Sequence, residues 1–272
     1  MKKISLLTVC LFALSCGGYQ GEVTFKIAQP LGQKSVYAIT NNLNMEIESP
    51  QLPGGSQKAV ALLSATLETE VTANQPDGRW TLESRFSSVE MTVDGQSIKE
   101  AKTLLENRAF SISMGKDGKV LDVSGVENLL PGMDLKQMMG QMNPAMMLPG
   151  KPVKVGESWP IEIASPLQVQ GAIFQQKLTG TGTLKDVSGG QALIDINYKM
   201  EMSLVEAGDD GMNMTGTGTG KSSLAYDLET ARFTSNKTET TIESIGLEDG
   251  PNRPPTSRSV IKSSMEVNLV NK

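Results

Sequence analysis

The feature that most constrains this chain is an alternation of apolar and polar residues with a period of two. It is longest between Ala192 and Leu204, where apolar side chains recur at every second position. Because successive side chains of a strand point to opposite faces of a sheet, this pattern predicts a strand with one apolar and one polar face. These 13 residues, at about 3.3 Å each, would span roughly 43 Å, which is long for a globular domain.

The same alternation recurs along the chain and is interrupted by turn sequences. Two further clear runs are 43–47 and 63–71. Between Trp80 and Val93 the apolar phase slips by one residue at Ser87 and Ser88, which predicts a β-bulge. Turns of the kind that close hairpins are expected at 76–78, 117–118, 188–190 and 209–211. The predicted fold class is mainly β: a long curved antiparallel sheet, either a half-barrel or two-lobed, with a few short helices packed on its concave face.

Three capping patterns predict those helices. A Ser or Asp at the helix start is followed three residues later by Glu or Gln in each of the pairs Ser97 and Glu100, Ser124 and Glu127, and Asp134 and Gln137. The first pair predicts a helix over 97–107. The other two predict a helical insert over about 124–147.

The first residues have the pattern of a bacterial export signal. Lys2 and Lys3 precede an apolar run that is too short to cross a bilayer, and Ser15 precedes Cys16. The stretch from Ala13 to Cys16 resembles the lipobox of bacterial lipoproteins, with Leu one position later than usual. We therefore expect a signal peptide at 1–15, a lipidated Cys16 with a short tether at 16–21, and one β-rich domain at 22–272. An ordinary secreted protein cleaved near Ser15 is the alternative.

The composition of the expected mature chain argues against several kinds of catalytic and binding site. The sequence has no His, and its two Cys residues are Cys10, within the signal, and Cys16. Loss of the signal leaves 23 basic against 30 acidic residues, a net charge near −7, which argues against nucleic acid as a partner. Without His, a free thiol or a G-x-S-x-G motif, no catalytic residue, metal site or cofactor is predicted. A carboxylate-only hydrolase has no supporting motif, so we expect a protein that is not an enzyme.

A methionine-rich segment is the most distinctive part of the chain. Leu135, Met138, Met139 and Met142 follow the spacing i, i+3, i+4 and i+7 of one helix face. Three interpretations are open. The face packs as ordinary core; the helix is a lid and its thioethers line a site for a lipid or other apolar ligand; or the thioethers bind Cu(I).

The sequence TGTGTGKS at 215–222 resembles a phosphate-binding loop only superficially. That motif requires Gly six residues before the Lys, and this position is Thr215. The alternating Gly216, Gly218 and Gly220, echoed by Gly180 and Gly182, instead predict strand positions where another element packs close to the backbone.

Two further motifs carry a resemblance to a known family. They are DGKVLDVSG at 117–125 and PVKVGESW at 152–159, on either side of the methionine-rich insert. Over about 108–245 the chain resembles an uncharacterised family of bacterial lipoproteins of unknown function. The resemblance implies a fold and an envelope location, and it implies no site residues. In outline the expected architecture is similar to that of LolA/LolB-type lipoprotein carriers.

These observations predict a lipid-anchored envelope lipoprotein that binds a lipid or other apolar ligand without catalysing a reaction. The membrane, reached through lipid on Cys16, is the expected partner, and the outer membrane is favoured because Gly17, not Asp, follows the Cys. The alternative is a structural or surface-exposed lipoprotein that binds a protein partner through its polar strand face or the 205–221 loop.

Overall fold

The computed structural model describes residues 19, 21–125, 143–169, 172–206, 214–246 and 257–270. The strands and helices, in chain order, are β1 (Lys34–Glu48), β2 (Ser56–Asn74), β3 (Trp80–Val93), β4 (Gln96–Ser97), α1 (Lys99–Leu105), β5 (Ala109–Met114), β6 (Val120–Ser124), the 3-10 helix η1 (Pro144–Met147), β7 (Ser158–Val169), β8 (Ala172–Ser188), β9 (Gln191–Glu206), β10 (Met214–Asp227), β11 (Arg232–Gly246) and β12 (Ser257–Leu269).

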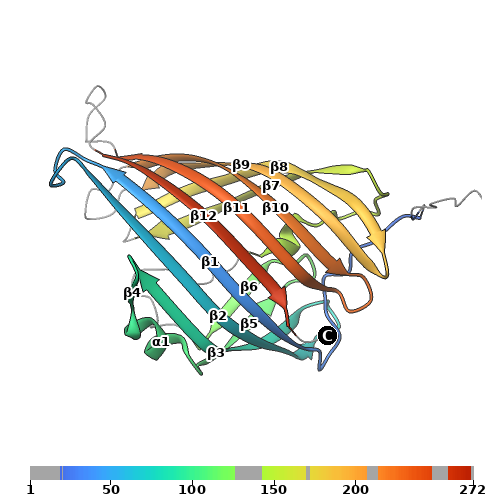
Figure 1. The fold of residues 1–272 in the computed structure, drawn as a ribbon. Helices are drawn as coiled ribbons and strands as arrows, with labels where there is room; N and C mark the ends of the chain where they lie inside the picture. Colours follow the sequence, from blue (N-terminus) through green and yellow to red (C-terminus); the bar gives the residue numbers. More distant parts are fainter. Residues whose placement is uncertain are drawn as a thin grey trace, which may run out of the picture.

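All of these strands belong to one 12-stranded antiparallel sheet (Figure 1). Its order is β6-β5-β3-β2-β1-β12-β11-β10-β9-β8-β7, and β4 pairs with β3 beside this path. The chain therefore builds one half of the sheet from β1 outward and the other half from β7 inward, and β1 and β12 meet in the middle. The predicted fold class, a long curved antiparallel sheet with few helices, is confirmed.

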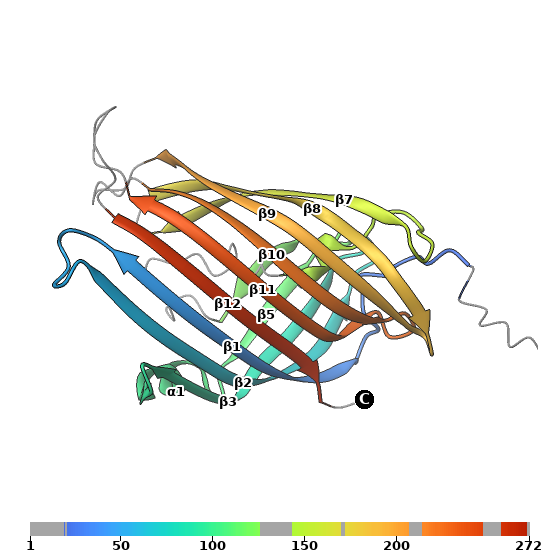
Figure 2. The same cartoon turned by 45° about the horizontal axis from the view of Figure 1, so that its top comes forward.

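The sheet curls so that its two ends face each other across a concave side, with β5 lying behind β1 and β12 (Figure 2). We call this concave side the inner face. On β9 it carries Ile194 and Ile196, each 1% exposed, whereas Asn197 and Lys199 lie on the opposite, outer face. The alternation predicted for 192–204 thus separates a packed inner face from a solvated outer face.

Several predicted details of the strands are confirmed. β2 pairs Thr66 with Ser88 and then Leu67 with Phe86, so Ser87 is the extra residue of a bulge. The turns at 76–78, 117–118 and 188–190 join β2 to β3, β5 to β6 and β8 to β9. The fourth predicted turn, 209–211, lies outside the described residues.

The helix predicted over 97–107 exists, but its predicted cap is wrong. The helix α1 begins at Lys99, and Ile98 occupies its N-cap without a side-chain hydrogen bond. Ser97 instead pairs with Thr92 in a hairpin. Asp94 and Gly95 close this hairpin with φ of 51° and 77°, as a type I′ turn requires.

The predicted helical insert over about 124–147 is corrected at its start. Ser124 is the last residue of β6 rather than a helix cap, and the following Gly125 has a φ of 90°, which does not fit the start of a helix. Residues 126–142 lie outside the described part of the chain. The segment ends in the short η1, whose N-cap is Asn143.

The helices lie on the inner face, as predicted. Leu105 of α1 packs beside Phe86 and Phe110. Met147 and Leu148 at the end of η1 pack against the main core. This core is formed largely by β7 to β10, together with Val23 and Phe25 from the segment before β1.

The predicted close approach to the glycine positions is confirmed by two aromatic rings. The Trp159 indole lies against Gly182, and the Tyr198 ring lies against Gly220. A β-carbon at either glycine would overlap the neighbouring ring. Gly182 and Gly220 therefore make room for large side chains that pack flat on the strands.

We expect Gly220→Ala to lower the free energy of unfolding by about 1–3 kcal/mol, since overpacking forces a ring or a strand to move. The Tyr198 hydroxyl is hydrogen-bonded to the Thr240 hydroxyl at 2.9 Å, so the ring has little freedom to withdraw. Urea unfolding measures the change. Gly150→Ala is the control, because no heavy atom lies within 4 Å of a β-carbon there. Equal stability of the two variants would contradict the packing described here.

Candidate functional site

The residues predicted from the sequence to carry function lie outside the described part of the chain. They are Cys16 and the four helix-face residues Leu135, Met138, Met139 and Met142. Lipidation of Cys16 and ligand lining by the other four therefore stay predictions. The chain is described again from Asn143, the residue after Met142, and this residue lies at a cavity on the inner face.

A cavity of about 160 Å³ lies where the inner faces of the two halves of the sheet meet. We call it the inner cavity. One wall comes from β3, β5 and β6 through Trp80, Leu82, Ile112, Met114 and Val120. The facing wall comes from β10, β11 and the turn between them, through Tyr226, Ala231 and Phe233. Its lining is mostly apolar, with Gln29 and Asn143 as the side-chain amides.

The short helix η1 closes the inner cavity and joins the two halves of the sheet. The Asn143 side chain donates to the carbonyl of Gly118, in the β5–β6 turn, at 2.7 Å. It also accepts from the Ala145 N–H at 3.0 Å, which caps η1. At the other end, the Trp159 Nε1–H of β7 donates to the carbonyl of Met147 at 2.8 Å. Ala145 and Leu148 add to the cavity lining.

Tyr226 fixes the wall formed by β10. Its ring makes edge contacts with Phe25 and Phe233, at centroid distances of 5.3 and 5.1 Å. Its hydroxyl donates to the carbonyl of Lys26. Burial, with a smaller contribution from the Asp227 carboxylate, raises the pKa of this hydroxyl well above its usual range. Tyr226 is therefore a neutral donor, and its hydrogen bond holds the segment before β1 against the sheet.

Buried polar groups without a partner gather around the inner cavity. Among the described residues, the Trp80 Nε1–H, the Ser84 hydroxyl and the Arg232 Nε–H are buried and make no hydrogen bond. Leaving such a group unsatisfied costs about 1–3 kcal/mol, and more for a charged group. Trp80 lines the cavity, and Ser84 follows the lining residue Leu82 on the same face of β3. Arg232 lies between the lining residues Ala231 and Phe233.

Arg232 is a buried cation, with only 7% of its surface exposed. One guanidinium nitrogen donates to the Ser35 hydroxyl at 3.2 Å and to the Lys34 carbonyl at 3.4 Å. Both acceptors are neutral, and Arg232 forms no ion pair with any described residue. Burial of a guanidinium is costly unless an anion accompanies it.

The charge of Arg232 acts on two neighbours. Burial raises the pKa of Tyr37, although the hydrogen bond from Ser35 and the charge of Arg232 act in the opposite direction. For Asp227, burial also acts upward, but the hydrogen bonds from Thr230 and Glu229 and the charge of Arg232 prevail and lower its pKa. Asp227 is thus an anion at neutral pH, and it accepts hydrogen bonds from the backbone of its own turn.

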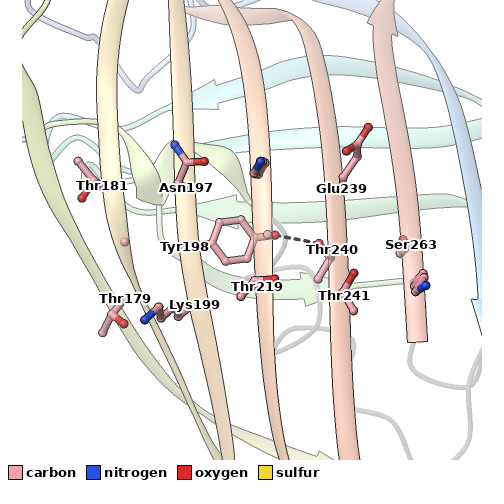
Figure 3. A pocket seen from close by; sticks show the side chains of 14 residues that line it. Thr179, Thr181, Asn197, Tyr198, Lys199, Thr219, Glu239, Thr240, Thr241 and Ser263 are labelled. Atoms are coloured by element: carbon pink, nitrogen blue, oxygen red, sulfur yellow. Dashed lines mark hydrogen bonds between the residues drawn. The ribbon is translucent and has the colours of Figure 1, made fainter. Parts of the chain in front are cut away.

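A second, larger hollow lies on the outer face, across β8 to β12 (Figure 3). We call it the outer groove. It has a volume of about 760 Å³, and its lining includes several threonines and four charged residues: Lys199, Lys221, Glu239 and Lys262. These three lysines form no ion pair with the described residues. Figure 3 also shows Tyr198 of β9, whose hydroxyl is hydrogen-bonded to Thr240 of β11. Tyr198 alternates with Asn197 and Lys199 and belongs to the main core, so its ring lies on the inner face behind the groove.

The outer groove is the larger hollow, but the inner cavity has the more specific chemistry. The outer groove is wide, and water can hydrogen-bond to its polar groups, so these groups need no ligand as a partner. The inner cavity combines an apolar space with the unpartnered indole N–H of Trp80, and the unpartnered Ser84 hydroxyl and Arg232 guanidinium belong to neighbouring residues. No three acidic residues in the described ranges come close enough to form a metal site, and no described helix is long and apolar enough to span a bilayer.

Residues 134–231 match the model of a family of unknown function, DUF6263. This agrees with the uncharacterised family expected from the sequence, over a shorter stretch than 108–245. The matched region contains η1 and all of β7 to β10, and it contributes Asn143, Ala145, Leu148, Tyr226 and Ala231 to the inner cavity. No curated protein matches the chain.

The sequence reasoning missed Asn143, Trp80 and Arg232. The Asn143–Pro144 dipeptide is a recognised turn signal and could have indicated the capped η1. Trp80 was assigned only to a strand face. No local signal distinguishes Arg232 from an exposed arginine at the start of a strand, because its burial depends on β1, about 200 residues earlier in the chain.

Proposed function

We propose that this protein is a non-enzymatic, membrane-proximal lipoprotein of the bacterial envelope that binds an apolar ligand on the inner face of its sheet. The inner cavity carries this proposal: it is an apolar space whose lining and neighbouring residues include buried polar groups without partners. Pockets of this composition, apolar with a few convergent polar groups, are typical of small-molecule sites.

The size of the inner cavity favours a ligand that is only partly contained in it. A cavity of about 150 Å³ holds a molecule the size of benzene, so the inner cavity accommodates one end of a longer molecule. From there the inner face continues along β1 to β3 and β12 as apolar side chains that are only partly buried. They include Leu43, Met45, Leu63, Met91 and Met265. Unbranched methionines in such a row adapt readily to a flexible chain.

The proposed membrane attachment rests on the signal sequence and Cys16. The described domain begins close behind them, because Val23 and Val153 form a β-bridge through hydrogen bonds of 2.8 and 3.0 Å. Five residues of tether at about 3.5 Å each keep the domain within roughly 20 Å of the bilayer. A location in the outer membrane and an architectural analogy with LolA/LolB-type carriers are parts of this same proposal.

Binding of a neutral apolar fluorophore tests the proposed function. The full chain carrying Cys16→Ser, without its lipid, would be titrated with N-phenyl-naphthylamine, whose emission rises in apolar surroundings. We expect saturable binding. Ala145→Leu, which fills the inner cavity, should weaken binding about 10-fold, consistent with an overpacking cost of about 1–3 kcal/mol.

The matched control is Ala38→Leu, which adds the same side chain on the exposed outer face of β1. It should bind the fluorophore as the parent chain does. Absence of saturable binding to the parent chain, or equal binding by Ala145→Leu, would refute the proposed function.

The outer groove favours a second candidate function, a structural or surface lipoprotein that binds a protein partner through its polar strand face. Its threonines and three unpaired lysines offer hydrogen-bond donors and positive charge on an otherwise acidic chain. Protease treatment of intact cells distinguishes the two functions. Cleavage of this protein supports surface exposure, whereas full protection excludes a role as a surface adhesin.

A further inference from the structure

We infer that the ligand is an anionic single-chain amphiphile, whose carboxylate or phosphate head group binds Arg232 while part of its apolar chain occupies the inner cavity. This inference rests on the proposed function and adds to it the chemical class of the ligand. Three observations carry it: the buried charge of Arg232 without an ion pair, its place beside the cavity, and the unpartnered donor of Ser84 in the same row.

Arg232 has donors to spare and forms no ion pair with a described residue, although Asp227 lies opposite it in the pairing of β10 with β11. A guanidinium carries five N–H donors, and the two hydrogen bonds of Arg232 come from a single nitrogen. Its Nε–H has no acceptor. The charge of Arg232 contributes to lowering the pKa of the Asp227 carboxyl group. This carboxylate accepts hydrogen bonds from the backbone N–H groups of Glu229 and Thr230 at 3.0 and 2.9 Å. The planar fork of Arg232 therefore remains able to bind an anion, for which its geometry is suited.

The strand register places Arg232 one row away from the inner cavity. Ser35, which accepts from Arg232, lies opposite Thr69 on β2, and Thr69 lies opposite Ser84 on β3. Residues that are opposite one another in neighbouring strands share a face of the sheet. Leu82, two residues from Ser84 on that face, lines the cavity. Two residues along a strand cover about 7 Å, so a head group at Arg232 and a segment of apolar chain in the cavity can belong to one molecule.

Ser84 and Trp80, both on β3, also carry buried donors without an acceptor. Both residues are nearly fully buried, at 3% and 4% exposure, and neither the hydroxyl nor the indole N–H has a partner among the described residues. The other tryptophan, Trp159, satisfies its N–H with a backbone carbonyl. A head group rich in acceptor oxygens supplies acceptors for Arg232 and for Ser84 in the same row, whereas a purely hydrocarbon ligand supplies none.

Competition between matched amphiphiles tests this inference. Palmitate, hexadecyl phosphate and hexadecanol would each be used to displace N-phenyl-naphthylamine from the full chain carrying Cys16→Ser. Hydrogen bonds to charged groups contribute about 1.5–3 kcal/mol, so at least one of the two anions should bind about 10- to 100-fold more tightly than the alcohol. The stronger of the two identifies the head group.

Substitution of Arg232 assigns that preference to this residue. Arg232→Met keeps an apolar stem and removes the charge, so it should abolish the preference for the anion and leave hexadecanol affinity unchanged. Arg85→Met, at an exposed arginine paired with Glu68 on the outer face, should change neither affinity. If Arg232→Met fails to fold, Arg232→Lys takes its place and should lower anion affinity about 3- to 10-fold, because the bidentate geometry is lost.

Equal affinities of the anions and the alcohol for the parent chain would overturn the inference while leaving the proposed function intact. Loss of alcohol and anion affinity together in a folded Arg232 variant would also overturn it, since this indicates a structural effect. Failure of the neutral fluorophore to bind at all is a different result, which refutes the proposed function itself.

Discussion

Trp159→Ala is expected to lower the free energy of unfolding by about 3–5 kcal/mol, as large-to-small substitutions of buried aromatic residues do. The indole is 4% exposed and belongs to the main core. Its N–H holds the end of η1 through the Met147 carbonyl, and its ring lies on Gly182. The variant thus loses packing, a hydrogen bond and the link between η1 and β7. Denaturant unfolding followed by circular dichroism measures the loss.

A double-mutant cycle separates the contact with Gly182 from the other effects. Gly182→Ala alone should cost about 1–3 kcal/mol, because the new methyl group meets the indole. In the Trp159→Ala background the methyl group enters vacated space, so the double variant should be at least about 1 kcal/mol more stable than the sum of the single changes predicts. Trp80→Ala combined with Gly182→Ala is the control pair, since Trp80 belongs to a separate core cluster. Additivity in both pairs would contradict the described contact.

Ile194→Ala is expected to cost about 3 kcal/mol, within the range for truncation of a buried aliphatic side chain. Ile194 is 1% exposed in the main core, where Leu184 lies opposite it on β8. For a domain of this size the change corresponds to a fall of about 6–12 °C in the melting temperature. Thermal unfolding by differential scanning fluorimetry provides the measurement.

The neighbouring Leu193 is a matched control for Ile194. It has the same number of side-chain atoms and the adjacent position, but it lies on the outer face and is 42% exposed. Leu193→Ala should change stability by no more than about 0.5 kcal/mol. If both variants lost equal stability, the assignment of inner and outer faces on β9 would be wrong.

Much of the sheet could be predicted because strand patterns are local. The side chains of β9 alternate over its whole length, and the slip of phase at Ser87 appears directly in the sequence. Both features depend only on the period of two and on the requirement that apolar side chains share one face. The glycines at 182 and 220 were also informative, because a missing side chain within a strand indicates a close neighbour.

Features that depend on contacts between distant segments could not be predicted. Ser97 has the composition of a helix cap, but the Asp94–Gly95 turn recruits it to a hairpin with β3. Arg232 is buried only because the start of β11 lies close to the start of β1, where Ser35 accepts its hydrogen bond. Trp80 reaches the inner cavity only because the curvature of the sheet brings β3 opposite β11. The candidate site therefore depends on how distant strands are arranged, and no local sequence motif predicts it.

The meeting of β1 and β12 in the middle of the sheet also governs how the chain can fold. Their register pairs Tyr37 with Leu269 and Glu48 with Arg258, so the central seam joins residues more than 200 positions apart. Contacts of such long range are slow to form because a large loop must close first. During synthesis, β1 to β6 can form neighbouring hairpins early, but β1 keeps an unpaired edge until β12 emerges. Exposed strand edges of this kind favour association with other chains. Until β12 has paired with β1, the exposed edge of β1 therefore has to be protected from association with other chains.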